Sequence, residues 1–103
     1  MFANKPVTLR CQIGQGGFSN ERVVRIQTAS DGTFVGVAHP NYCRTAAGAP
    51  LKPGQPGRGE KIDGLVMART LQQQEGGTLL VSVPDGSVLA VGEDVLGPPV
   101  PTE

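Results

Sequence analysis

The chain has 103 residues, which is enough for one domain with a core of its own but not for two. Lysine and arginine together number 9, as do aspartate and glutamate, so the formal net charge is +0. A chain without net charge lacks the overall field that draws basic proteins to nucleic acids or anionic membranes. The 15 glycines and 9 prolines lie between apolar runs, which is typical of a turn-rich β fold. We therefore expect one β domain over residues 1–103.

The sequence carries no recognisable targeting or membrane segment. Residues 1–5 are predicted to be a loose N-terminus, without the apolar stretch of a secretory signal peptide. No run approaches the ~18 apolar residues of a membrane span. The two cysteines, Cys11 and Cys43, are more typical of free thiols in a reducing compartment than of a disulfide framework, although one disulfide stays open. These observations predict a cytoplasmic protein that does not contact a membrane.

Three strands are predicted in the first half of the chain. Residues 7–13 alternate apolar with polar side chains, the period-two pattern of a strand with one buried face. Cys11 falls on the buried side and is expected to be a small core residue. Residues 21–28 and 33–38 form the second and third strands, and Phe34 is expected in the core because it is a large apolar side chain.

A glycine-rich stretch, residues 14–20, separates the first two strands. Glycine lets the chain reverse direction without strain, so we expect a hairpin tip here. The alternative is that backbone N–H groups of this loop bind a phosphate or a carboxylate. Phe18 at the tip is the best candidate for contact with a partner, with Ser19 beside it; the alternative for Phe18 is that it caps the mouth of the barrel.

Residues 44–61 form a predicted loop that is rich in proline and glycine and carries a local positive charge. Four cations, Arg44, Lys52, Arg58 and Lys61, stand against one anion, Glu60. Loops of this length in small domains are usually functional or disordered. Further arginines, Arg10, Arg22 and Arg25, are expected on the solvent-facing side of the neighbouring strands, so Arg22 is included with the loop cations as a candidate contact residue.

The second half repeats the order of the first. Strands are predicted at 64–71, 78–83 and 87–91, with a short closing strand at 95–96 and an extended proline-rich tail over 97–103. Residues 65–74 would also fit a helix, but the likeness between the halves favours a strand. The strands at 78–83 and 87–91 are apolar on both faces, which indicates cover on both sides. One cover is the barrel itself, and the other is predicted to be a second copy of the chain.

One short phrase occurs in both halves. Residues 31–38, which begin Asp-Gly, are echoed by residues 85–92, which begin Asp-Gly as well. Asp-Gly between apolar runs predicts a two-residue type I′ hairpin turn. The echo predicts two similar three-stranded meanders joined by the long loop. Together they would form a small all-β barrel of five to six short antiparallel strands, a class that resembles SH3-like and Tudor-like barrels in length and hairpin density.

The side chains that usually perform catalysis are scarce in this sequence. Cys11, His39 and Cys43 could supply three zinc ligands, but there is no Cys-x-x-Cys pair and Cys11 belongs to a separate strand. A Cys43–His39 nucleophile pair and the adjacent acids Glu93 and Asp94 are equally isolated. We therefore expect no metal, no cofactor and no enzymatic activity.

Two functions remain for a small β domain of this composition. The first is a protein-interaction module that associates with itself, which the two-sided apolar strands favour. The second is a nucleic-acid-binding barrel that uses the basic loop 44–61, since small barrels of this kind bind nucleic acid strands with cations and exposed aromatics. The neutral net charge and the small number of aromatic residues favour the first.

Overall fold

In the computed structural model, which describes residues 5–18, 20–30, 32–52 and 54–98, the chain is all-β, as predicted. The described residues form seven strands and three short 3-10 turns, with no α-helix. The strands are β1 (Lys5–Gln15), β2 (Arg22–Gln27), β3 (Thr33–Ala38), β4 (Cys43–Thr45), β5 (Lys61–Gln73), β6 (Thr78–Ser82) and β7 (Val88–Gly92). The 3-10 turns are η1 (Pro40–Tyr42), η2 (Glu75–Gly77) and η3 (Glu93–Val95).

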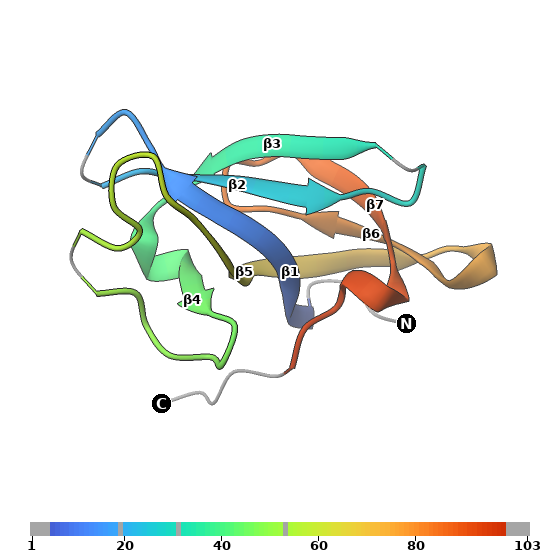
Figure 1. Ribbon diagram of the computed structural model, residues 1–103. Helices are drawn as coiled ribbons and strands as arrows, with labels where there is room; N and C mark the ends of the chain where they lie inside the picture. The colour runs from blue at the N-terminus through green and yellow to red at the C-terminus, as the bar shows by residue number, and fades with distance from the viewer. Residues whose placement is uncertain (1–4, 19, 31, 53, 99–103) are drawn as a thin grey trace.

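The sheet consists of two antiparallel meanders placed back to back (Figure 1). The strand order is β3-β2-β1-β5-β6-β7, with β4 paired to β5 outside this path. The first strands of the two meanders, β1 and β5, pair with each other from Lys5↔Thr70 to Gly14↔Lys61. The predicted architecture of two three-stranded meanders is therefore confirmed, and the segment 65–74 is a strand rather than a helix over most of its length.

The sheet curls into a nearly closed barrel in which the outer strands β3 and β7 approach each other. At one point the gap is bridged: the N–H of Ala29, in the β2–β3 turn, donates to the carbonyl of Ala90 in β7 at 2.8 Å. Further along, a Cβ placed on Gly36 of β3 would lie only 2.7 Å from a carboxylate oxygen of Asp85, which lies in the β6–β7 turn. The space between β3 and β7 is called the seam here.

The core fills the inside of the barrel with one face of every long strand. Alternate residues of β1 and β5 point inward, as the period of two requires, and they meet the inward residues of the other strands. The core consists of Leu9, Cys11, Ile13, Val24, Ile26, Ala38, Cys43, Val66, Ala68, Leu79, Val81, Val83, Leu89, Val91 and Val95. Cys11 is buried as predicted, whereas Phe34 is only partly buried and packs against the edge of this cluster.

The Asp-Gly echo is not a structural repeat, because the two turns are placed differently. The hairpin bond of the first turn runs from the N–H of Thr28 to the carbonyl of Gly32, and that of the second from Val83 to Ser87. The first bond begins three residues before its Asp-Gly pair, and the second only two. A shift of one residue moves every side chain to the other face. Accordingly, positions 35 and 37 are exposed, whereas the matching positions 89 and 91 are buried.

The second Asp-Gly pair does not form the predicted type I′ turn, and Asp31 of the first pair lies outside the described residues. The N–H of Gly86 donates to the carbonyl of Val83 at 2.9 Å, so Pro84 and Asp85 are the two central residues. The proline ring fixes a negative φ, which a type I′ turn does not allow at its first central position. Instead Gly86 follows the turn with a φ of 92°, the geometry of a three-residue loop that ends in a left-handed glycine.

The connector and the ends differ from the prediction in their bounds. Residues 44 and 45 belong to β4 and residue 61 to β5, so the loop is shorter than 44–61. Residues 95–96 do not form a strand: Val95 ends η3, and Leu96 makes an isolated bridge to Leu9. The predicted tail is described only at Gly97 and Pro98, and the predicted loose N-terminus only at Lys5, which begins β1. The Thr8 hydroxyl donates to the carbonyl of Pro98 at 2.7 Å.

Candidate binding groove

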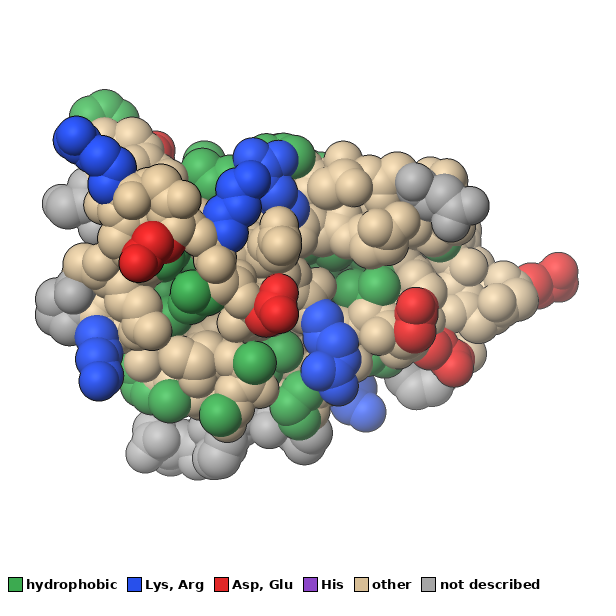
Figure 2. Space-filling view, viewed as in Figure 1, with side chains coloured by type: hydrophobic (Ala, Val, Ile, Leu, Met, Phe, Trp, Pro, Cys, Tyr) green, Lys and Arg blue, Asp and Glu red, His purple; other side chains and the backbone are tan. Residues whose placement is uncertain are grey.

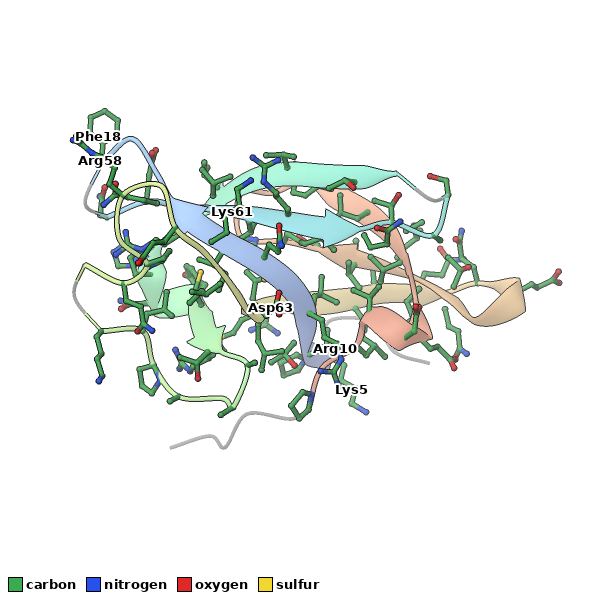
Figure 3. The ribbon with its side chains drawn as sticks, in the orientation of Figure 1. Lys5, Arg10, Phe18, Arg58, Lys61 and Asp63 are labelled. Atoms are coloured by element: carbon green, nitrogen blue, oxygen red, sulfur yellow. The ribbon has the colours of Figure 1, made fainter. Side chains whose placement is uncertain are left out.

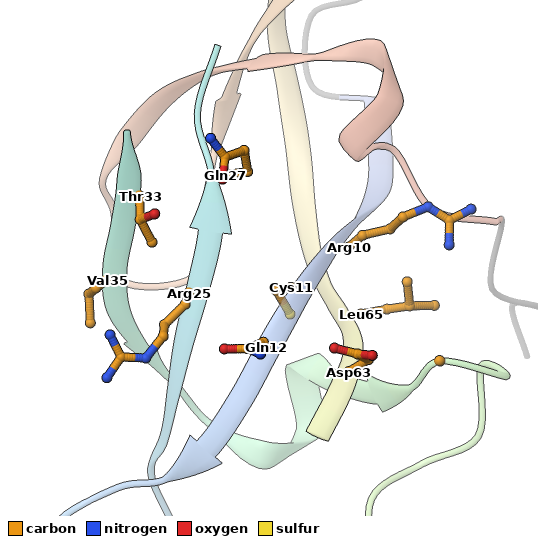
Figure 4. A pocket seen from close by; sticks show the side chains of 11 residues that line it. Arg10, Cys11, Gln12, Arg25, Gln27, Thr33, Val35, Asp63 and Leu65 are labelled. Carbon is orange, nitrogen blue, oxygen red and sulfur yellow. The ribbon is translucent and has the colours of Figure 1, made fainter. Parts of the chain in front are cut away.

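A groove of about 760 Å³ lies on the outer face of four neighbouring strands (Figure 4). Its walls are two cross-strand rows, set by the strand register. One row runs Val35, Arg25, Gln12, Asp63 over β3, β2, β1 and β5. The other contains Thr33 opposite Gln27 and Arg10 opposite Leu65. These residues line the groove together with Ala46.

The groove opens where β1 and β2 separate. Their register ends at the Gln12↔Arg25 pair, although both strands continue. Beyond that point the free edge of β1 is taken by the C-terminal segment, through the Leu9↔Leu96 bridge and a bond from the N–H of Gly97 to the carbonyl of Thr8 at 2.9 Å. The C-terminal segment therefore bounds the groove, because it occupies the edge of β1 that β2 leaves free.

Two guanidinium groups stand on opposite sides of the groove, with Gln12 and Asp63 between them (Figure 4). Arg10 and Arg25 are both exposed. Neither has a hydrogen bond or an ion pair with any residue that the structure describes. A free guanidinium offers five N–H donors in a plane that matches a carboxylate or a phosphate.

Several cations are spread over one face of the barrel, although the net charge is zero. Figure 3 shows Lys61, Arg10 and Lys5 spread along the face that carries β1, and Arg58 beside Phe18 at one corner. The same face also carries acidic side chains, some among the cations and others near the β5–β6 end (Figure 2). Glu75 lies in η2 and Glu93 in η3, and a Cβ on Gly77 of η2 would come within 3.8 Å of the Glu93 carboxyl group. The β5–β6 end of this face is therefore acidic, whereas the rest of the face carries charges of both signs.

Four of the predicted loop and hairpin residues are exposed surface groups. Lys52, Arg58 and Lys61 are exposed, and Phe18 is exposed to 71%. Phe18 therefore does not cap the barrel. Ser19 lies outside the described residues. None of these residues lines the groove, so the structure does not gather the predicted site into one pocket.

Arg22 and Arg44 form hydrogen bonds with backbone carbonyls and are not exposed surface groups. Arg22 is only 5% exposed, and its guanidinium donates to the carbonyls of Gln55 at 3.0 Å and Glu21 at 2.7 Å. The expectation that Arg22 faces solvent was wrong, because it shares the inward phase of Val24 and Ile26 on β2. Arg44 is partly buried and donates to the carbonyls of Asn41 and Cys43.

The two cysteines face the core and are not bridged. Burial, reinforced by neighbouring Cys43 and Asp63, raises the pKa of Cys11 to about 12. Burial raises the pKa of Cys43 to about 11, against a lowering effect of Arg22 and Arg44. His39 is engaged elsewhere: its Nδ1 accepts from the N–H of Asn41 at 3.1 Å. Among the described residues no group of three His, Cys, Asp or Glu side chains is placed to hold a metal ion.

The raised thiol pKa values predict a loss of stability in alkali. In the unfolded chain each thiol ionises near its ordinary pKa of 9.0, before the folded thiol does. The free energy of unfolding should therefore fall as the pH rises from about 9 towards 11, with a slope of up to about 1.4 kcal/mol per pH unit for each thiol. Urea titrations between pH 7 and 11 measure this slope. In Cys11→Ala the slope should flatten, and an unchanged slope would contradict the assignment.

The sequence reasoning placed Arg10 and Arg25 together on the solvent-facing side of the strands but missed Gln12 and Asp63. The available signal was the alternation itself, since Arg10 and Gln12 share one face of β1, and Arg25 and Gln27 share one face of β2. The alternation pattern could not show the pairing of β1 with β5, which brings Asp63 beside Gln12.

The fold and the groove together define a small, nearly closed antiparallel β-barrel with a charged groove on its outer face. Comparison of the chain with protein families, curated proteins and solved structures found no match. No helix in the described part of the chain is long and apolar enough to cross a lipid bilayer.

Proposed function

We propose that this chain is a non-catalytic protein-interaction module that associates with itself along the seam. The observation that carries the proposal is the placement of exposed valines on the two edge strands. Val35 and Val37 on β3 are 51% and 42% exposed, and Val88 on β7 is 55% exposed. Exposed apolar residues that cluster on edge strands are a usual mark of an interaction surface.

The edge strand β3 also lacks the devices that normally prevent pairing with another chain. Its sequence, Thr-Phe-Val-Gly-Val-Ala, has no charged residue and no proline. Among the described residues β3 pairs only with β2, so its other edge carries no ladder. Edge strands that stay monomeric are usually charged, bulged or covered. Packing of the exposed valines of β3 against those of a second copy is two-fold symmetric, and the zero net charge imposes no overall repulsion between copies.

The apolar pattern of the second half supports the same surface. Leu89 and Val91 face the core, whereas Val88 and its neighbours Leu80 and Ala90 face outward. Leu80 and Ala90 are a cross-strand pair on this outer face. The predicted second cover for these strands would thus lie beside the seam.

Sedimentation velocity tests this proposal. The wild-type chain should show a mass that rises with concentration in the micromolar range. A lysine at the edge opposes strand pairing, so Val35→Lys should raise the dissociation constant at least tenfold. Ala49→Lys is the control, because Ala49 is exposed in the loop after β4, a strand that pairs with β5 and not with β3 or β7 among the described residues. A wild-type monomer at all concentrations up to the high micromolar range would overturn the proposal, as would equal effects of the two substitutions.

Nucleic-acid binding is the second candidate, favoured by the cations on the face shown in Figure 3 and by Phe18 beside Arg58. Each phosphate that is neutralised should contribute about −0.7 to the slope of log affinity against log salt for a single strand. A fluorescent ten-nucleotide oligo-dT at low salt is a direct probe. Absence of binding to it would remove this candidate.

Two finer assignments stay predictions. Membership of the SH3-like or Tudor-like class would need a match in strand geometry to such barrels. A cytoplasmic location is supported by the two unbridged thiols, since free buried cysteines are usual in reducing compartments.

A further inference from the structure

We infer that the groove on the outer face of β3, β2, β1 and β5 binds an extended acidic segment of a partner protein. The inference rests on the proposed function of protein interaction and names the chemistry of one partner. It concerns a surface other than the exposed edges of the seam, although Val35 borders both. Four features of the groove support it: its main-chain groups, its two free arginines, its one carboxylate and the residue types of its walls.

The main chain at the groove is directed for contact with an extended strand. The hydrogen bond from the N–H of Thr28 to the carbonyl of Gly32 fixes the alternation of β2, so the N–H and carbonyl of Gln27 point away from β3, towards β1. The Leu9↔Leu96 bridge and the bond from Gly97 to Thr8 place the C-terminal segment along the edge of β1 beside Arg10, so the main-chain groups that face the gap are those of Gln27 on β2. The β1–β2 register stops at Gln12 and Arg25 and does not join these groups.

The charges of the groove favour carboxylates in a separated arrangement. Arg25 and Arg10 lie on opposite sides and are unpaired among the residues described, so each can take one carboxylate in a two-point contact. Asp63 lies between them, next to Gln12. A segment with acidic residues on either side of a basic or neutral residue complements this order.

The same carboxylate argues against a polynucleotide in the groove. A nucleic acid strand carries a negative charge at every nucleotide and would place a phosphate close to Asp63. Among the described residues the groove is also lined without an aromatic side chain, and stacking on aromatics supplies much of the affinity for single strands. Its other lining side chains, such as Gln12, Gln27 and Thr33, are amides and hydroxyls that suit a peptide main chain, with Val35 for apolar contact.

The probe is an acetylated, fluorescein-labelled nonapeptide, Gly-Thr-Glu-Val-Lys-Val-Glu-Thr-Gly. In an extended strand the two glutamates and the lysine share one face, because side chains alternate. Fluorescence anisotropy should show saturable binding to the full chain. A peptide with both glutamates changed to glutamine should bind at least tenfold more weakly, because it lacks the carboxylates for the two arginines.

Variants of the chain locate the site. Arg25→Glu and Arg10→Glu should each raise the dissociation constant at least tenfold, and Lys52→Glu should leave it unchanged. All three change one exposed cation to an anion, but Lys52 lies outside the groove. Asp63→Asn should weaken the probe and strengthen a peptide in which threonine replaces the lysine. Circular dichroism melts of each variant show whether it is folded.

The outcomes separate this inference from the proposed function. No binding of the probe up to 1 mM, equal binding of the glutamine peptide, or an equal effect of Lys52→Glu would each overturn the inference, whatever the sedimentation result. Tighter, Arg10- and Arg25-dependent binding of the ten-nucleotide oligo-dT would overturn it in favour of nucleic acid. If a strictly monomeric chain binds the probe, the inference about the groove is supported and only the proposal of self-association is contradicted.

Discussion

Replacing Gly64 by alanine should lower the free energy of unfolding by about 3 kcal/mol, which is the upper range for overpacking a core. Gly64 lies in β5 between Cys11 of β1 and Thr45 of β4. A Cβ at this position would lie 2.5 Å from Cδ1 of Ile13 and 2.5 Å from the carbonyl oxygen of Arg44. One neighbour is a buried side chain and the other is backbone, so neither can move away without disturbing the barrel.

A second substitution separates the two contacts. Ile13→Val removes the Cδ1 atom and should cost about 1 kcal/mol on its own. In the double variant Gly64→Ala with Ile13→Val, the total loss should be at least 1 kcal/mol smaller than the sum of the single losses, because the side-chain clash is gone. Urea unfolding of the four proteins measures this coupling. Strict additivity would show that Ile13 does not limit the site.

Leu9→Ala should destabilise the barrel by a similar amount, about 3 kcal/mol within the 2–5 kcal/mol range for buried leucines. Leu9 is fully buried, pairs with Val66 and bridges Leu96. Its truncation would leave a cavity at the junction of β1, β5 and the C-terminal segment, and none of these can collapse without breaking a ladder.

Val88→Ala provides the comparison for Leu9→Ala. It removes apolar atoms from a side chain that is more than half exposed, so its effect should stay within about 0.5 kcal/mol. Thermal and chemical unfolding of both variants, at a concentration where the wild type is monomeric, give the two values. Equal losses would contradict the structure, in which Leu9 is buried and Val88 is exposed.

The alternation of apolar residues was sufficient to predict the strands. Residues 7–13 alternate so regularly that β1 and its buried Cys11 follow from the period of two alone. The same pattern, applied strictly to β2, would have placed Arg22 with Val24 and Ile26 on the inside. Arg22 was instead placed among the surface cations because it is an arginine. The carbonyls of Gln55 and Glu21 accept hydrogen bonds from its guanidinium, which explains why this group is tolerated at a buried position.

The Asp-Gly echo shows where local sequence misleads. Both copies predicted the same turn, yet Pro84 holds the second turn in a different geometry and the hairpin bond shifts by one residue. Because side chains alternate, that shift exchanges the inner and outer faces of β3 and β7. A similarity of residues therefore did not give a similarity of environment, which depends on the position of the turn relative to the strand.

The sequence alone determined that this chain is an all-β barrel of two meanders, because strand periodicity and turn residues act over a few neighbouring positions. Only the tertiary structure decided where a ligand could bind. Arg25, Gln12 and Asp63 are far apart in the chain and become neighbours through the pairing of β2, β1 and β5. The pairing of strands from different halves, and the C-terminal segment that separates β1 from β2, are long-range contacts that no local pattern encodes.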